Sequence, residues 1–545
     1  APIRTQCITS YDQTHLLVAS QDSIRLLNTN TLKQKSICGI EDMFQINTLF
    51  YDHKREVVWI GTSTDGLFYL DMKKKTLLPF SNFPKQPIAV ITESSDSTLL
   101  VGIDGQGVWE LDKDKKKVLN ILKEDIDNPF SLRGDGVYDI FCDGQQRVWV
   151  TTYTGGLSFF DWKSPLINQI THQVNNPNSL GNDNVNKILE DSKGDIWFAT
   201  NNGISRWRVA TNEWDTYYQN KQEQAQVFLA LCEDDEGNIW AGSFSSGFYV
   251  LDRNTGKELV HYPRNTSDLK SDSKFIMNIY KDSEGDIWIG GIQDVICYLT
   301  KEKRFHTYGA QPMRMFMEFS PGKMLLACTY SVLLLDKETG KITFLPECLA
   351  QDILVMGDDI WVATSGDGLL HHNYTTRETH KITVESGLPS NYVNSVMYDN
   401  GYLWLGTENG LCRYNPADST VHTYYSTLAL SSASFNVNAS CKLRNGELMW
   451  GTNNGAVMFD PDKLYHTQLN GEIYFQNITI SGSSIRENQD LLRGIPVNKQ
   501  TDISFKYDQN TLTLEVLPIG VSSKEIKFSW KMEGLDAEWS HPSSQ

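Results

Sequence analysis

A short pattern of apolar and polar positions recurs along the whole chain, and residues 194–204 show it clearly. A turn ends at Gly194, an apolar strand runs from Ile196 to Thr200, and a tight turn through Asn201 and Asn202 leads to Gly203. Residues that tolerate positive φ stand in both turns. Short strands joined by tight hairpins, without a helical period, predict a twisted antiparallel sheet.

The residues on either side of this copy complete a four-stranded unit. Residues 184–190 begin with alternation and predict a first strand, residues 204–208 predict a third, and residues 212–217 predict a turn and an outer strand. One such sheet cannot bury both of its faces, whereas a ring of sheets buries each against its neighbours. Trp197 is therefore expected to pack between neighbouring sheets.

Eleven copies of the pattern follow one another, roughly 36 to 49 residues apart, which is the length that a four-stranded propeller blade requires. The copies are anchored at residues 16–20, 58–62, 99–102, 148–152, 196–200, 240–243, 288–291, 325–328, 361–364, 404–407 and 449–452. The sequence thus predicts an all-β fold built from β-propeller blades.

Eleven blades exceed the four to eight of a usual propeller, so two rings are expected. We assign residues 1–163 to four blades of a first, incomplete propeller and residues 164–464 to a seven-bladed propeller. Either further blades precede Ala1 in the native protein, or very degenerate ones lie within the chain. Beyond these, strand-like segments at 471–480, 502–507, 511–516 and 526–531 predict an Ig-like β-sandwich over 465–545, cut short at its C-terminus.

Charge and composition narrow the class of protein. The 545 residues are 40% hydrophobic and 21% charged, as in a globular protein, with a net charge of -18. An acidic chain argues against nucleic acid or an anionic membrane surface as a main partner. Nine scattered cysteines give no zinc or disulfide spacing and are expected to be buried thiols. No run of 18 apolar residues is present in the sequence.

Several phrases of the sequence resemble the two-component-regulator propeller repeat. They include DSKGDIWFATNNGISRW from Asp191, DSEGDIWIGG from Asp282 and GYLWLGTENGLCRY from Gly401. The inter-blade phrases at 175–185 and 387–393 are similar to that family too. Residues 528–539 resemble the Y_Y_Y domain that follows such propellers, although Phe528 and Trp530 stand where tyrosines are frequent.

This resemblance implies the periplasmic sensor region of a Bacteroides-type hybrid two-component regulator, part of an inner-membrane protein. It implies an oligosaccharide ligand, a homodimer, a membrane helix beyond the C-terminus and a histidine kinase outside this chain. The output would be control of glycan-utilisation genes. The region itself would not be an enzyme and would need no cofactor.

Candidate ligand-binding residues are expected where the second strand of a blade turns into the third, since propeller ligands usually use that face. Aromatic rings suit the apolar faces of sugars, and amides and carboxylates suit their hydroxyls. The competing interpretation is that these residues only form turns. The candidates are Tyr153, Asn201, Asn202, Phe244, Tyr330, Asp367, Glu408, Asn409 and Asn453, with Asn454 beside the last.

Two other functions stay open at this point: a glycan lyase or hydrolase on a propeller scaffold, and a protein-interaction scaffold. The segments 191–197 and 282–288 resemble the Asp-box of sialidases, but that box is a structural turn. Hydrolysis by two carboxylates would require a pair at a fixed separation, which the sequence does not single out. No P-loop, HExxH motif or nucleophile elbow is present, and we expect no catalytic or metal-binding residue.

Overall fold

The computed structural model describes the chain except for residues 1–4, 41–44, 129–130, 144–146, 162–166, 220–226, 264–268, 270–274, 310–311, 425–433, 465–471, 488, 501, 520–527, 541–542 and 544–545. The described residues are almost all in strands and turns, which confirms the all-β propeller fold. The chain divides into two compact units, Ala1–Lys163 and Ser164–Gln545. No described helix is long and apolar enough to cross a membrane.

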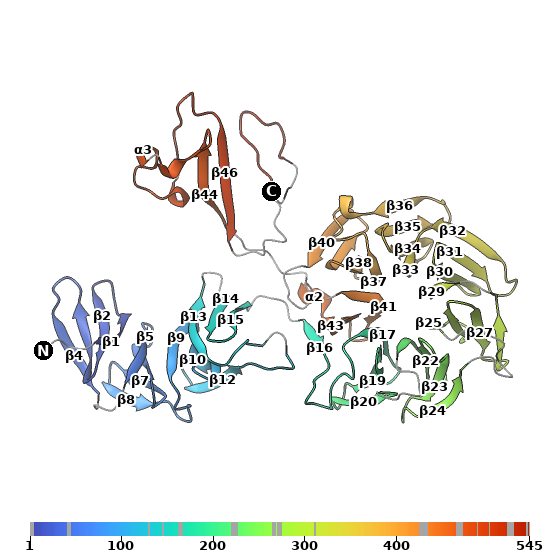
Figure 1. Cartoon of the computed structure of the whole chain (residues 1–545), viewed down its shortest axis with the longest axis horizontal. Helices are drawn as coiled ribbons and strands as arrows, with labels where there is room; N and C mark the ends of the chain where they lie inside the picture. Colours follow the sequence, from blue (N-terminus) through green and yellow to red (C-terminus); the bar gives the residue numbers. More distant parts are fainter. Residues whose placement is uncertain are drawn as a thin grey trace. The chain divides into compact units, whose positions relative to one another are not determined.

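The first unit contains four consecutive antiparallel sheets, and each sheet begins at its inner strand (Figure 1). The inner strands β1, β5, β9 and β13 lie side by side in that order. The four sheets are β1(Thr5–Ser10) to β4(Gln34–Gly39) with β2(His15–Ser20) and β3(Ser23–Asn28); β5(Ile46–Asp52), β6(Val57–Thr62), β7(Leu67–Asp71) and β8(Thr76–Pro79); β9(Ile88–Ser95), β10(Thr98–Ile103), β11(Gly107–Asp112) and β12(Lys117–Leu122); and β13(Val137–Cys142), β14(Arg147–Thr152) and β15(Gly156–Asp161).

The second unit contains a ring of seven four-stranded sheets within its described residues (Figure 1). Six of them use consecutive strands. They are β17(Val185–Glu190), β18(Ile196–Thr200), β19(Gly203–Arg208) and β20(Glu213–Tyr217); β21(Phe228–Glu233), β22(Asn238–Ser243), β23(Phe248–Asp252) and β24(Glu258–Tyr262); β25(Ile276–Lys281), β26(Ile287–Gly291), β27(Val295–Leu299) and β28(Arg304–Thr307); β29(Met313–Ser320), β30(Lys323–Cys328), β31(Ser331–Asp336) and β32(Ile342–Glu347); β33(Ala350–Met356), β34(Asp359–Thr364), β35(Leu369–Asn373) and β36(Thr379–Ile382); and β37(Val393–Asp399), β38(Tyr402–Thr407), β39(Gly410–Asn415) and β40(Thr420–Tyr424).

The seventh sheet closes the ring by joining the two ends of this segment. Its inner strand is β41(Phe435–Lys442), followed by β42(Leu448–Thr452) and β43(Gly455–Phe459), and its outer strand is β16(Asn168–Ile170). β16 pairs antiparallel with β43, Gln169 lying opposite Val457, while β17 packs against β41. The repeat pattern does not reveal this closure, because β16 has only three residues and its sequence lacks alternation.

In three sheets of the ring the repeat tryptophan is hydrogen-bonded to the turn before it. In β18, β22 and β26 the indole Nε1 of Trp197, Trp240 and Trp288 donates to an aspartate six residues earlier, at 2.8 to 2.9 Å. The same carboxylates accept backbone N–H groups of their own turns. These tryptophans are almost fully buried between sheets, so the Asp-box motif here is a scaffold device, as the sequence predicts.

Small residues in the second strand let the next sheet approach closely. A Cβ added at Gly61, Gly242 or Gly406 would lie within about 3 Å of atoms in the neighbouring inner strand, such as Ile88, Ile276 and Phe435. At Gly451 the obstacle is backbone, because the Val185 carbonyl oxygen would lie 2.5 Å from the added Cβ. Glycine is therefore required for close packing at these positions, including the closure between β17 and β42.

The threonine or serine that ends the second strand fixes the following hairpin. The hydroxyls of Thr200, Thr407 and Thr452 donate across the turn to the carbonyl of the glycine three residues later, at 2.7 to 2.9 Å. Each hydroxyl oxygen also accepts a backbone N–H from the turn. All three side chains are fully buried, so the Gly-Thr part of the repeat is structural as well.

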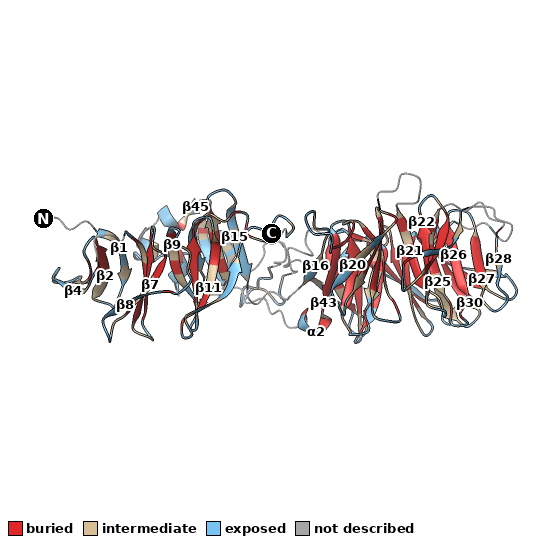
Figure 2. Cartoon of the chain, turned by 90° about the horizontal axis from the view of Figure 1, so that it is seen from below, coloured by how far each residue is buried: buried red, intermediate tan, exposed pale blue. Residues whose placement is uncertain are grey.

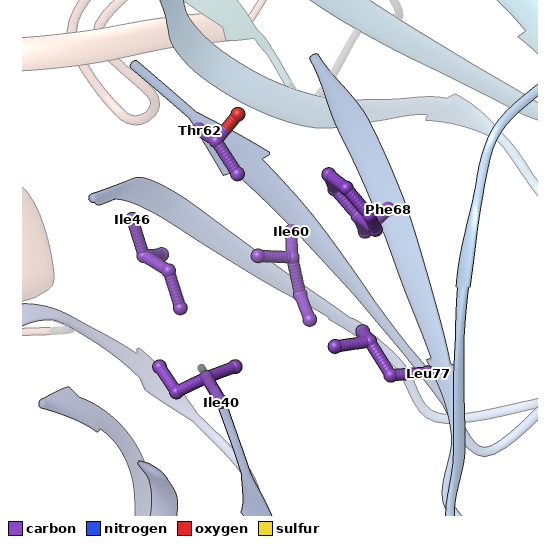
Figure 3. A pocket seen from close by; sticks show the side chains of 6 residues that line it. All are labelled: Ile40, Ile46, Ile60, Thr62, Phe68 and Leu77. Carbon is purple, nitrogen blue, oxygen red and sulfur yellow. The ribbon is translucent and has the colours of Figure 1, made fainter. Parts of the chain in front are cut away.

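Burial follows the middle strands of the sheets, as Figure 2 shows by the red interiors of both units. In the first unit a cavity of about 10 Å³ lies among the apolar side chains shown in Figure 3. Thr62 is the one polar residue in its lining, and its hydroxyl already donates to Gly66. A space of this size holds at most about one water, so it is a packing defect rather than a ligand site.

Beyond the ring, described residues form a short helix, α2(Pro461–Leu464), and a three-stranded sheet. The sheet consists of β44(Glu472–Ile480), β45(Ser483–Ser484) and β46(Leu512–Ile519), with the turns η2(Ile485–Glu487), α3(Gln489–Leu492) and η3(Val497–Lys499) between β45 and β46. Another 3-10 turn, η1(Val384–Ser386), belongs to the ring. The strands predicted at 471–480 and 511–516 correspond to β44 and β46.

The strand predicted at 502–507 is wrong, since these residues have no ladder partner. Ile503 and Phe505 instead pack on the cluster of Ile478, Ile485 and Val497, which explains the apolar alternation without a strand. Of the strand predicted at 526–531, residues 526 and 527 lie outside the described residues, and Phe528 forms only an isolated bridge with Ser543. A sandwich over 465–545 stays a prediction.

We predict that Gly451→Ala lowers the free energy of unfolding of the second unit by about 1–3 kcal/mol, because its Cβ meets the Val185 carbonyl at the ring closure. Gly39→Ala is the control, since a Cβ at Gly39 meets nothing within 4 Å. Urea unfolding of both variants measures the effect. Equal stability of the two variants would contradict the close-approach explanation.

Candidate functional site

The turns between second and third strands lie together on one face of the ring, because every sheet of the ring has the same strand order around its inner strand. Eight of the predicted binding residues stand in these turns, and we call this the turn face. Tyr153 stands in the equivalent turn of the first unit, between β14 and β15, where its ring meets Tyr138 edge-on at 5.3 Å. It is therefore described separately.

Each inner strand of the ring carries a β-bulge at its start, next to the turn face. The register shifts after the first residue in all seven inner strands, for example between Val185 and Lys187 and between Met313 and Met315. Bulges re-aim side chains and are frequent beside binding sites. The bulged residues in six strands are Asn186, Leu229, Met277, Arg314, Gln351 and Asn394; in β41 the bulge spans residues 436–439.

Three of these bulged residues are asparagines whose side-chain amides are fixed. Asn186 donates Nδ2 to the Phe228 carbonyl at 2.8 Å, and Asn394 donates to the Phe435 carbonyl at 2.8 Å. Asn436 donates to the Val185 carbonyl at 2.7 Å. Within the described part of the chain their Oδ1 atoms accept no hydrogen bond, so three oriented acceptors remain on this face.

A charged donor and exposed aromatic rings accompany these amides. Arg314 donates through Nη1 to Oε1 of Gln351, one sheet further along the ring. The Tyr330 side chain is 77% exposed, and Phe244 meets Phe275 edge-on at 5.2 Å. Tyr392 is also exposed. The turn face thus combines amide acceptors, a guanidinium and aromatic rings.

Among the predicted residues, Asn201 and Tyr330 fit a binding role best. Oδ1 of Asn201 accepts from the bulged Asn186 at 2.9 Å, which links turn and bulge. The Tyr330 carbonyl accepts from Cys348 N at 3.2 Å, and among the described residues its hydroxyl forms no hydrogen bond. The bulged residues could not be recognised from the sequence, because a bulge leaves the apolar pattern of a strand almost unchanged.

The other candidates also have structural roles. Asn202 and Asn409 donate backbone N–H groups to the hairpin threonines, and Asn453 accepts from Ser434 N at 3.3 Å. The Asp367 carboxylate pairs with Lys381 at 2.7 Å, and Glu408 donates its backbone N–H to Tyr392. Their assignment to ligand binding stays a prediction.

A channel of about 600 Å³ runs along the inner strands of the ring. Lys187 lies in it and donates Nζ to Oδ1 and the carbonyl of Asn438, at 2.9 and 3.1 Å. The Asp352 carboxylate accepts N–H groups of Ile353 and Val396, both at 2.9 Å. Burial raises the pKa of Asp352 to about 6 and lowers the pKa of Lys187.

The described residues give little support for a metal site or for a reactive cysteine. Among the described residues, one acidic group has metal-like spacing, Asp282 with Glu284 and Asp286. The ammonium of Lys337 lies 2.6 to 2.8 Å from all three carboxylates and fills that position. The nine cysteines are free thiols, and burial raises the pKa of Cys232 to about 12, which disfavours the reactive thiolate.

Comparison with protein families decides the nature of the repeats. The family described as Two component regulator propeller matches residues 179–202, 222–245, 270–293 and 387–409, which cover the first strands of four sheets of the ring. The chain carries two-component regulator propeller repeats. This confirms the resemblance of the propeller repeats.

Two relatives of these propeller repeats extend the picture. Histidine kinase P4 of Formosa agariphila is 24% identical over 339 residues, which make up 55% of this chain and 24% of that protein. The chain thus spans about a quarter of the length of this curated relative. The extracellular domain of BT3049 from B. thetaiotaomicron, named as a hybrid two component system, is 20% identical with a TM-score of 0.71. The match covers 99% of this chain and 72% of that one, and it shows the shared fold.

We predict that the buried Asp352 makes the ring less stable as the pH rises from about 4 to 6. The unfolded carboxyl ionises near pH 3.8 and the folded one near pH 6, so between these values the unfolded state has lost a proton that the folded state keeps. Asp352→Asn removes this dependence. The free energy of unfolding of the variant minus that of the wild type should therefore increase between pH 4 and pH 6 and stay constant above pH 6.

Urea unfolding of both proteins at several pH values measures this effect. Asp418→Asn is the matched control of opposite sign, because hydrogen bonds from Thr420 lower the pKa of Asp418. The wild type should lose stability relative to that variant as the pH falls below about 4. An Asp352→Asn difference that does not change with pH would contradict the prediction.

Proposed function

We propose that this chain is the periplasmic sensor region of a two-component system, and that it binds an oligosaccharide on the turn face of the ring. The propeller repeats, the histidine kinase relative and the fold shared with an extracellular domain support a sensor role. A histidine kinase outside this sequence would receive the signal and control genes for glycan use.

The single observation that carries the sugar ligand is the set of fixed asparagine acceptors on the same face of the ring as exposed aromatic rings. Sugar hydroxyls are donors that suit the oriented Oδ1 atoms of Asn186, Asn394 and Asn436. The aromatic rings offer platforms for the apolar faces of sugars. Because the amides are held by neighbouring backbone carbonyls, little conformational entropy is lost when a ligand binds.

Signalling requires that the ligand binds two arrangements of the protein unequally. The bulged amides join consecutive sheets of the ring, since Asn394 and Asn436 each reach the backbone of the next inner strand. A ligand across several bulges would therefore favour one arrangement of these sheets. We propose that a homodimer, tethered to the membrane by a helix outside this sequence, converts that preference into kinase control.

We predict that Tyr330→Ala weakens binding of the recognised oligosaccharide at least tenfold, because it removes an exposed ring from the turn face. Titration calorimetry with neutral, uronic-acid and amino-sugar oligosaccharides identifies the ligand and gives the affinity. Phe344→Ala on the outer strand β32 is the matched control, since Phe344 is 75% exposed but lies away from the turns.

Asn394→Asp tests the amide acceptors, because a carboxylate cannot donate to the Phe435 carbonyl. It should weaken binding while Phe344→Ala leaves it unchanged. An equal loss in Tyr330→Ala and Phe344→Ala would contradict the assignment to the turn face. The absence of binding across the whole panel, or chemical turnover of a saccharide, would contradict the sensor itself.

A further inference from the structure

Another cavity, of about 240 Å³, lies between two neighbouring sheets of the ring, at the end of their second strands that is opposite to the turn face. It is lined by the first turn of the sheet β21–β24, with Asp234, Glu236 and Asn238, and by Trp240. Tyr298 and Thr300 of the next sheet complete it. This cavity is remote from the turn face, because a first turn and a second turn stand at opposite ends of the same strand.

The neighbouring junction shows what such a turn binds. There Asp282, Glu284 and Asp286 occupy the same positions of the repeat as Asp234, Glu236 and Asn238, counted back from Trp288 and Trp240. Lys337 directly follows β31 of the next sheet, and its ammonium contacts Asp282 at 2.6 Å, Glu284 at 2.6 Å and Asp286 at 2.8 Å. The cation also stands 6.0 Å from the centroid of the Trp288 ring.

The junction with the cavity lacks this lysine. Thr300 directly follows β27 and so stands where Lys337 stands in the next repeat. Its hydroxyl donates to the Gly285 carbonyl at 2.7 Å, within its own sheet. In the described part of the chain, neither Asp234 nor Glu236 forms an ion pair, although Asp234 accepts from Trp240 Nε1 at 2.8 Å.

In other repeats a cation of the chain lies over the ring of the repeat tryptophan. Arg206 stacks 5.1 Å from the Trp197 centroid, and Lys116 lies 4.2 Å from the Trp59 centroid. At Trp240 the neighbouring ring is instead Tyr298, 5.3 Å away, so two aromatic walls stand beside the carboxylates. Carboxylates with aromatic faces form an environment that attracts organic cations.

We propose that this cavity binds the primary ammonium group of an organic ligand. The ammonium would occupy the place that Lys337 fills next door, with Asp234 and Glu236 as acceptors and Trp240 and Tyr298 as walls. Both an amino sugar and a lysine side chain of a peptide carry this group. The site is independent of the proposed sugar face and does not depend on that function.

Lys303, in the turn before β28, is the basic residue among the described residues that line the cavity. Lys281 pairs with Asp235 at 2.7 Å and so neutralises that carboxylate rather than Asp234 or Glu236. Lys303→Met removes the competing charge at the entrance. Ammonium binding by this variant should equal or exceed that of the wild type.

Saturation-transfer NMR and titration calorimetry on the full 545-residue chain test the proposal. The probes are D-glucosamine and Nα-acetyl-lysine-N-methylamide, each beside its neutral N-acetylated counterpart. We expect at least one ammonium probe to bind and its neutral counterpart to bind at least tenfold more weakly. Binding of glucosamine alone assigns an amino sugar, and binding of the lysine derivative alone assigns a peptide side chain.

Three variants place the site. Glu236→Gln should lower the affinity for the ammonium probe at least fivefold. Glu284 is the equivalent carboxylate in the Lys337 junction, and Glu284→Gln should leave that affinity unchanged. Thr300→Lys supplies an internal ammonium and should abolish binding while raising the unfolding temperature. The proposal is overturned if the wild type binds neither ammonium probe, or if binding persists in both Glu236→Gln and Thr300→Lys.

Discussion

The close approach of neighbouring sheets is the constraint on which the ring depends. Gly242, Gly406 and Gly451 leave no room for a side chain, because the next inner strand occupies the place of their Cβ atoms. The buried tryptophans fill the remaining space between sheets, and the indoles of Trp197 and Trp288 donate to the aspartates of the preceding turns. This packing holds the inner strands at fixed spacing and thereby positions both the turn face and the channel.

Much of this fold could be predicted from the sequence, because the repeat consists of residues that the blade cannot replace. Trp197, Thr200 and Gly203 each have one structural task and recur at fixed spacing. The closure by β16 could not be predicted, since three residues of edge strand carry too little pattern. A strand at 502–507 was predicted wrongly, because Ile503 and Phe505 are spaced as in a strand but pack against a cluster without pairing with another strand.

The candidate site was predictable only by its place in the topology. Turn residues such as Asn201 were predicted because they stand where the second strand turns into the third, and the structure links Asn201 to Asn186. The bulged residues Arg314 and Asn394 were missed, since a bulge is defined by register rather than by residue type. The cavity beside Trp240 could not be predicted either, because it depends on Thr300 standing where the next sheet has Lys337.

Ligand sensing by this protein is proposed to take place on the turn face. Hydrogen–deuterium exchange with and without a bound oligosaccharide tests this proposal, since it reports on every turn of the ring at once. Protection is expected at the second turns and at the bulges around Asn186, Asn394 and Asn436, with little change at the first turns such as 191–194 and 282–285. Protection confined to the first turns, or to the outer strands, would contradict the account.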